Sequence, residues 1–157
     1  MLRKVYGSAI NGIESTIITI EVTVEKGINF LIVGLPDNSV KESQQRISTA
    51  LNHYGYKIPG KRIVINMAPA DLRKEGASYD LPLAIGILSA SEQITADDIE
   101  EYIIMGELSL DGNLRKIRGA LPIAIEAQRQ GYKKLILPKE NAKEAAIVSG
   151  ITIYGAT

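Results

Sequence analysis

The chain has 157 residues, of which 45% are hydrophobic and 23% charged, with no cysteine and a single histidine, His53. This length suits one domain with a sizeable core, and the composition excludes a disulfide framework and a thiolate or histidine-rich metal site. The formal net charge of zero argues against a strongly basic nucleic-acid-binding domain but leaves room for local basic patches. With no apolar run near the ~18 residues of a membrane span and no signal-peptide pattern, we expect a cytoplasmic domain without membrane contact.

The first half of the chain predicts a β-hairpin, a short strand and a helix. Runs rich in Ile, Val and Thr favour strands, and Asn11-Gly12 between the first two runs is a strong hairpin-turn signal. The period of the apolar residues then becomes helical, with a capping box of Ser39 and Glu42, or Asp37 as an alternative cap, at its start. The expected elements are strands Arg3–Ile10, Ile17–Val24 and Asn29–Val33 and a helix over Ser39–Tyr54.

The second half of the chain alternates strands with helices. Leu81–Ser91 is apolar almost all round, as expected of a central buried helix. Strands followed by strand–helix alternation indicate an α/β fold with a mixed sheet covered by helices, in a single domain over residues 1–157. The other expected elements are strand Arg62–Met67, strands Tyr102–Gly106 and Leu108–Leu114 with a turn at Asp111-Gly112, helix Ala120–Gln130, strand Lys134–Leu137, a short helix opened by Asn141 with Glu144, and strand Ile151–Tyr154.

The segment from Gly55 to Lys61 has the G-x-x-x-x-G-K spacing of a phosphate loop. Arg62 stands where that motif needs Ser or Thr to hold Mg²⁺. The segment also leaves a helix and enters a strand, which reverses the order that places phosphates at a helix N-terminus. We therefore interpret it as a helix-to-strand connection and expect no ATP and no other cofactor in this domain.

Ser78 lies where a charged loop meets the start of the buried helix. It could act as a nucleophile near the helix amides, or as an N-cap that accepts the amide of residue 80 or 81. A serine nucleophile needs a base, and His53 at a helix end is a poor candidate, so the cap is favoured. The same loop carries four charged residues, for which ion pairs and caps are expected rather than acid–base chemistry: Asp71, Arg73, Glu75 and Asp80.

Three strings resemble the proteolytic domain of Lon peptidases: Lys74-Glu75-Gly76-Ala77-Ser78 before an apolar helix, Met105 to Leu114, and Gly131 to Pro138 with Glu140-Asn141. The resemblance implies the ribosomal-protein-S5-domain-2-like, Lon-proteolytic-domain-like fold. It also implies a catalytic lysine at the start of the helix after the strand pair, where this chain has Leu121. Ser78 is then a relic of the nucleophile position. Arg118 cannot be deprotonated and Lys116 precedes the helix, so neither is expected to replace the lysine.

A closer resemblance covers nearly the whole chain. Its strings are Ile32 to Asp37, Val40-Lys41-Glu42-Ser43 with Arg46, and Asn66 to Gly76, which together are similar to the N-terminal, ChlI-type domain of the Mg-chelatase-like AAA+ family (ComM type). That resemblance implies a non-proteolytic domain followed by an AAA+ ATPase domain that would hold ATP and Mg and is absent here. It further implies a hexameric ring acting as a DNA translocase or branch-migration helicase in competence or recombination. This domain would serve ring assembly or DNA guidance.

Candidate nucleic-acid contacts are the dense basic groups of the chain. The alternative is a solvated surface balanced by the acidic run Asp97-Asp98-Ile99-Glu100-Glu101. Aromatic residues make up only 5% of the chain, so base stacking is not obviously provided for. Two other functions stay open, a Ser78-dependent hydrolase with an unrecognised base and a protein-binding adaptor. The basic candidates are Lys61, Arg62, Arg73, Lys74, Arg115, Lys116 and Arg118.

Overall fold

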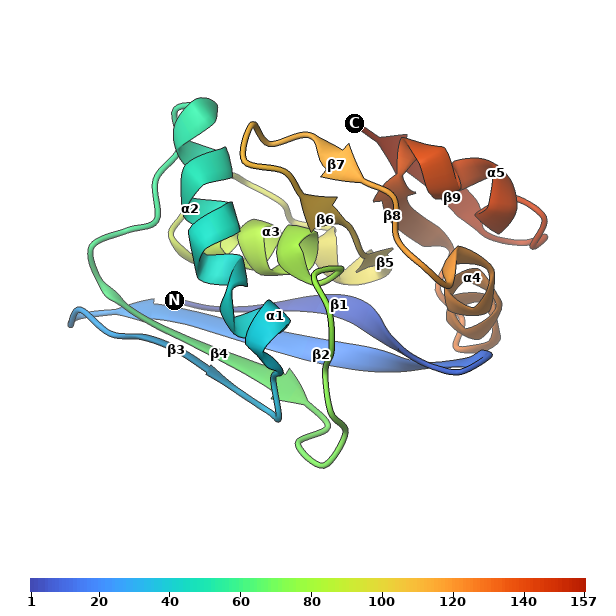
Figure 1. Cartoon of the computed structure of the whole chain (residues 1–157), viewed down its shortest axis with the longest axis horizontal. Helices are drawn as coiled ribbons and strands as arrows, with labels where there is room; N and C mark the ends of the chain where they lie inside the picture. Colours follow the sequence, from blue (N-terminus) through green and yellow to red (C-terminus); the bar gives the residue numbers. More distant parts are fainter.

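The computed structural model describes residues 1–157 and confirms the α/β class with a mixed sheet (Figure 1). Seven strands form one sheet in the order β3-β4-β2-β1-β5-β8-β9. β2 runs antiparallel to its neighbours β1 and β4, and the remaining neighbours pair in parallel. The strands are β1 Leu2–Asn11, β2 Glu14–Glu25, β3 Phe30–Val33, β4 Arg62–Ala68, β5 Tyr102–Ile104, β8 Lys134–Pro138 and β9 Thr152–Ala156.

The predicted hairpin forms as expected. β1 and β2 pair from Leu2↔Thr23 to Asn11↔Glu14, and Gly12 in the turn has a φ of 65°, a left-handed conformation that suits glycine. Alternate residues of β2 are buried on one face, namely Ile18, Ile20, Val22 and Val24. This strict alternation fixes which face of the sheet turns to the core, since a slip by one residue would expose the whole set.

Helices cover the sheet from both sides. α3 (Asp80–Ala90) lies against β1 and β2, and a methyl group at Gly86 would approach Val22 Cγ2 to 2.7 Å. α4 (Ala120–Arg129) packs on the opposite face near the hairpin end, where Ser15 Oγ donates to Pro122 O (2.9 Å). α2 packs on α3 rather than on the sheet (Figure 1). The buried hydrophobic residues form one cluster of 32. None of the helices combines the length and hydrophobicity needed to cross a bilayer.

The helix expected over Ser39–Tyr54 is divided. It forms α1 (Asn38–Lys41) and α2 (Ser43–His53), with Glu42 between them. The capping box of Ser39 and Glu42 is wrong, because the alternative, Asp37, caps the helix by accepting from Val40 N (2.8 Å). The cap lies two residues earlier than Ser39, because Asp37 has the extended backbone conformation that a cap requires.

The segment after β5 also differs from its prediction. Leu108–Leu114 was expected as one strand, but its two ends belong to different strands. β6 (Glu107–Leu108) and β7 (Leu114–Arg115) pair with each other and form a separate hairpin. The expected turn at Asp111-Gly112 is the tip of this hairpin. Farther on, Asn141 opens the short helix α5 (Ala142–Ala145) without a side-chain cap, because its amide instead bonds both Ile117 N and Ile117 O (2.9 Å each). Two 3₁₀ turns complete the fold, η1 Ile99–Glu101 and η2 Lys139–Asn141.

Candidate functional site

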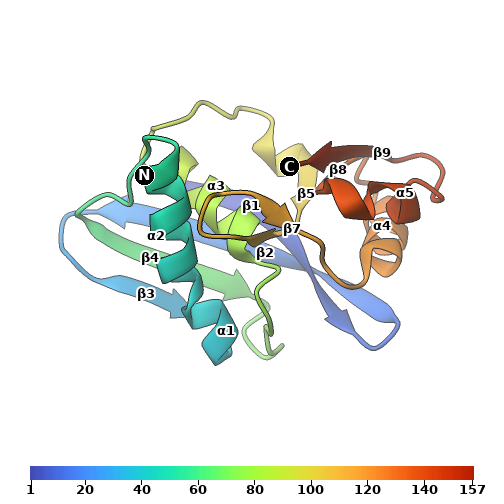
Figure 2. The same cartoon turned by 45° about the horizontal axis from the view of Figure 1, so that its top comes forward.

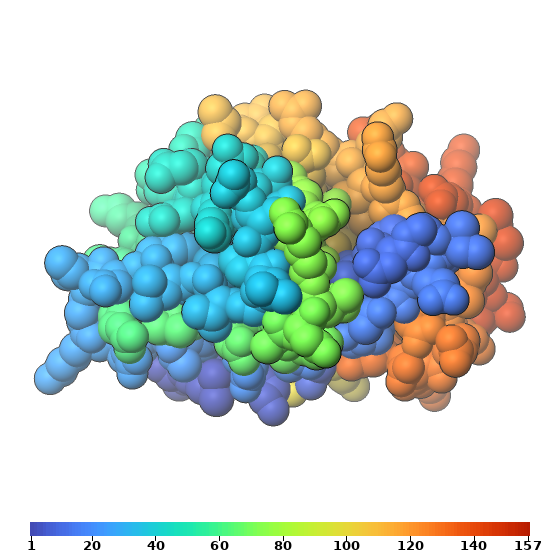
Figure 3. Space-filling view, turned by 60° about the horizontal axis from the view of Figure 1, so that its bottom comes forward, coloured from blue at the N-terminus to red at the C-terminus, as the bar shows by residue number.

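Ser78 opens onto a groove of about 670 Å³ between the end of β1 and the loop that precedes α3. The loop stands between α1 and the β1–β2 hairpin, as the light-green segment of Figure 3 shows. Strand ends, loops and one residue of α4 all contribute to the groove, so no single motif of the sequence contains it. The polar and charged lining residues are Ser8, Asn11, Asp37, Arg73, Glu75, Ser78, Glu107, Lys116 and Arg118.

The loop before α3 is fastened to the turn between β3 and α1. Asp37 N donates to Lys74 O (2.9 Å), and Lys74 N donates to Leu35 O (3.0 Å). Asp37 Oδ2 also accepts Gly76 N (3.0 Å) while its other oxygen caps α1. Gly34 makes this turn possible, because its φ is 109° and a Cβ there would lie 2.1 Å from Met67 O. The loop therefore reaches the groove in a fixed conformation.

The expected N-cap role of Ser78 is wrong. α3 begins at Asp80, and Tyr79 occupies the cap position without a side-chain hydrogen bond. The amides that Ser78 would have satisfied already have backbone partners, since Asp80 N donates to Ala77 O (3.1 Å) and Leu81 N to Gly106 O (3.0 Å). Ser78 O accepts Gly106 N (2.8 Å), whereas the Ser78 hydroxyl has no hydrogen-bond partner within the chain. The side chain is half-buried at the groove and free to contact a ligand.

No basic side chain hydrogen-bonds Ser78. Lys74, four residues away, is fully buried, its Nζ donates to Pro69 O, and burial lowers its pKa. Leu121 lies in the first turn of α4, where its amide donates to Glu144 Oε2 (3.1 Å). His53 lies at the end of α2 and does not line the groove.

The structure brings three of the seven basic candidates together at the groove: Arg73, Lys116 and Arg118. Arg73 pairs with Glu75 (3.0 Å) on the exposed rim. Lys116 and Arg118 are exposed and form no ion pair. Their charges are therefore available to an anionic ligand.

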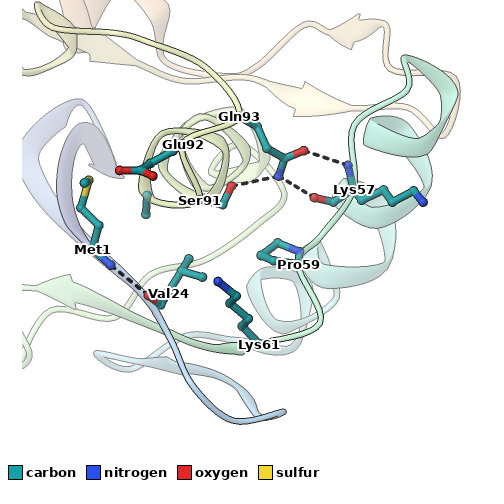
Figure 4. A pocket seen from close by; sticks show the side chains of 9 residues that line it. Met1, Val24, Lys57, Pro59, Lys61, Ser91, Glu92 and Gln93 are labelled. Carbon is teal, nitrogen blue, oxygen red and sulfur yellow. Dashed lines mark hydrogen bonds between the residues drawn. The ribbon is translucent and has the colours of Figure 1, made fainter.

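The other four basic candidates lie elsewhere. Lys74 is buried, as described, and has no surface to offer. Lys61 lies in a separate pocket of about 430 Å³ beside the start of β4, where Gln93 bonds both backbone groups of Lys57 (Figure 4). Arg62 pairs with Glu25 (3.0 Å), and Arg115 is on β7 outside the groove.

Asp80 is a residue whose partners the sequence did not indicate. It was expected in the ion pairs of its own loop, but it is completely buried and accepts four hydrogen bonds. Arg46 donates through Nε (2.7 Å) and Nη2 (3.0 Å), Ser43 Oγ donates at 2.7 Å, and Leu108 N at 3.1 Å. This bonding raises the pKa of Arg46. The network ties α2, α3 and the β6–β7 hairpin together; the only hint in the sequence was the presence of Ser43 and Arg46 in the family-like strings.

Comparison with known proteins agrees with this architecture. The chain is 44% identical over 156 residues to competence protein ComM of Haemophilus influenzae and 46% identical over 150 residues to the protein YifB of Escherichia coli K12. It is 35% identical over 101 residues, 64% of this chain and 18% of the relative, to Lon protease 2 of Bacillus subtilis. The matches to ComM and YifB cover 99% and 95% of this chain, and the chain spans only 30% and 29% of the length of these two relatives.

The mixed sheet, with Ser78 leading into α3, and the similarity to a Lon protease define a Lon-protease-like α/β domain. The profile of the family described as subunit ChlI of Mg-chelatase matches residues 20–141. The chain belongs to that family.

Proposed function

We propose that this domain is a non-proteolytic, DNA-guiding part of a longer ATP-driven DNA motor. The observation that carries the proposal is that two exposed cations without an ion pair, Lys116 and Arg118, line the same groove as Ser78. Cations that neutralise phosphates release counterions and so provide affinity without sequence preference. Arg73 adds a third cation on the rim, partly offset by Glu75.

The chemistry around Ser78 supports the non-proteolytic part of the proposal. Ser78 needs a neighbouring base to become a nucleophile. Leucine at position 121 can neither accept a proton nor carry charge, and the amine of buried Lys74 is engaged by Pro69 O. We infer that the hydroxyl is retained as a ligand contact or a relic of an ancestral peptidase.

The longer relatives support the wider assignment. The relative ComM is named a competence protein, and it is more than three times as long as the part that matches this chain. A protein of that length has room for a further domain. We propose that an AAA+ domain follows this one in the whole protein, binds ATP and Mg, and assembles with its copies into a hexameric ring. This domain then stands on the DNA path of the ring.

The test is fluorescence anisotropy of labelled single-stranded, duplex and branched DNA with this domain over a salt series. The double variant Lys116→Ala/Arg118→Ala should weaken binding and reduce the salt slope by about 1.4 to 1.8, at ~0.7 to ~0.9 per phosphate contact. The matched control is Lys133→Ala/Lys143→Ala, which removes the same charge from exposed positions outside the groove. Equal losses in both variants, or no binding by the parent domain at low salt, would refute the proposal and favour a protein-binding adaptor.

A Ser78-dependent hydrolase is the second candidate, because Lys116 lines the same groove as Ser78. The lysine would have to move within ~3 Å of the hydroxyl and lose its proton to serve as base. Labelling by a fluorophosphonate probe that Ser78→Ala and Lys116→Ala both abolish would support this activity. The DNA-guiding proposal expects no labelling of the parent domain.

A further inference from the structure

An exposed aromatic segment lies at the C-terminal end of α2, outside the groove. Tyr54 is 60% exposed and Tyr56 is 37% exposed. The ring of His53 packs edge-on against Tyr54, with ring centroids 5.4 Å apart. Single exposed apolar side chains are ordinary, and what distinguishes this segment is that three aromatic residues lie within four positions of the chain. We call His53, Tyr54 and Tyr56 the tyrosine segment.

The Tyr54 ring is held in place although most of it is open to solvent. It packs against the tip of the β6–β7 hairpin, where a Cβ at Gly112 would lie 2.3 Å from Tyr54 Cε2. Glycine is favoured at position 112 for two reasons. Its φ of 86° lies in the left-handed region, and the Tyr54 ring occupies the space that a side chain would need. A ring fixed before binding loses little conformational freedom when a ligand stacks on it.

The same hairpin connects the tyrosine segment to the groove. Its first strand begins at Glu107 and its second strand is followed by Lys116; both residues line the groove, while the hairpin tip touches Tyr54. The hairpin runs beside α2 in Figure 2. The four steps from Gly112 to Lys116 span at most about 13 Å at ~3.3 Å per residue, which is close to the length of roughly four stacked bases at ~3.4 Å each.

The charges around the tyrosine segment suit an anionic chain. Lys57 follows Tyr56 directly and is exposed, and Arg115 on β7 is exposed as well; neither forms an ion pair. Two acids lie on the same hairpin: Asp111 at its tip accepts Ser109 Oγ and the Asn113 amides, and Glu107 is the cross-strand partner of Arg115. Lys57 and Arg115 still offer positive charges from which a phosphate backbone gains more than an apolar protein partner does.

We propose that Tyr54 and Tyr56 are a base-stacking platform that makes the domain prefer single-stranded DNA to duplex DNA. The inference rests on the proposed DNA-guiding function and specifies its ligand. Bases of a single strand present free faces to aromatic rings, whereas bases inside a duplex are already stacked. Phosphates of the strand would reach Lys116 and Arg118 at the groove while its bases lie along the hairpin on the tyrosines.

The experiment compares a labelled oligothymidylate of 12 nucleotides with a duplex of the same length, using the domain and two double variants. Tyr54→Ala/Tyr56→Ala should weaken single-strand binding by about five- to 150-fold for each of the two rings on which a base stacks, and leave duplex binding within two-fold. Tyr54→Phe/Tyr56→Phe is the matched control and should bind as the parent does. Thermal melting checks that all three remain folded.

Intrinsic fluorescence supplies a readout that a merely structural role would not change. The chain has seven tyrosines and no tryptophan, so stacking on Tyr54 and Tyr56 should quench the tyrosine emission. The quench should be largely lost in the phenylalanine variant although its affinity is retained.

The outcomes separate this inference from the function on which it rests. Single-strand binding that needs Lys116 and Arg118 but is unchanged by the alanine substitutions at the tyrosines would overturn the platform and keep the DNA-guiding role. Equal binding of single strand and duplex by the parent would do the same. No DNA binding of either kind would refute both, and capture of a protein partner through Tyr54 would then be the alternative.

Discussion

Replacing Asp80 by Asn tests whether the buried network under the groove holds the domain together. Each Asp80 oxygen accepts two donors, Ser43 Oγ and Arg46 Nη2 on one and Arg46 Nε and Leu108 N on the other. An asparagine amide would place its NH₂ against an Arg46 donor in either orientation, since only the Ser43 hydroxyl can turn to accept from it. Arg46 would also keep its charge in a position that is only 20% exposed.

The expected loss of stability is about 3 to 5 kcal/mol, the usual cost of breaking a buried pair by removing one partner. At ~2 to ~4 °C per kcal/mol for a chain of this size, Tm should fall by about 6 to 20 °C. Urea unfolding followed by circular dichroism measures the free energy. The matched control is Glu75→Gln, since the Arg73–Glu75 pair spans a similar distance, 3.0 Å, but is about two-thirds exposed and should contribute at most ~1 kcal/mol.

The reasoning would be refuted if Asp80→Asn and Glu75→Gln lowered the unfolding free energy by the same amount. A double-variant cycle with Arg46→Met sharpens the result. The two buried substitutions together should cost at least ~1 kcal/mol less than the sum of their separate costs, because Arg46 and Asp80 are in direct contact. An additive cycle would mean that the pair acts only through packing.

Three further predictions concern the core, a buried charge and a buried amide. Gly86→Ala should destabilise the domain by about 1 to 3 kcal/mol despite the better helix propensity of alanine, because the new methyl would meet Val22 Cγ2 at 2.7 Å; a rise in Tm would show that α3 shifts freely. Burial lowers the pKa of Lys74, so the unfolded chain binds more protons than the folded one between the folded pKa and ~10.5, and stability should rise with pH through that window. Lys74→Met should flatten this rise in urea midpoints measured from pH 7 to 10, and an unchanged slope would contradict the assignment. Asn141→Ala should cost about 2 to 6 kcal/mol by leaving Ile117 N and O unpaired in the interior, at ~1 to ~3 kcal/mol for each unsatisfied group. Hydrogen exchange at the Ile117 amide should rise, and continued protection would refute the prediction.

The regular elements were predicted from the sequence with few errors. Alternating apolar residues and the Asn11-Gly12 turn predicted the β1–β2 hairpin, and the all-round apolar run predicted α3 as a buried helix. The errors lie at ends and junctions, such as the cap at Asp37 and the division at Glu42. An element end depends on one or two hydrogen bonds, so a small tertiary preference moves it.

The candidate site was predicted only in part. Ser78 was identified as the residue to examine, but its cap role failed because Gly106, far along the chain, pairs with the start of α3 through both of its backbone groups. The seven basic candidates could not be ranked from the sequence. The fold alone decided that Lys116 and Arg118 share a groove with Ser78, that Arg62 is paired and that Lys74 is buried.

By itself, then, the sequence determined the periodic structure, the family resemblance and the leucine at position 121, because these depend on neighbouring residues or on motif strings. Only the tertiary structure decided which charges are free and which side chains meet. Arg46 and Asp80 are 34 residues apart, and Gly112 receives the ring of Tyr54 from another element. Such contacts follow from strand order and helix packing, which bring together segments that are far apart in the sequence. The local sequence of one segment does not indicate which other segment it will contact.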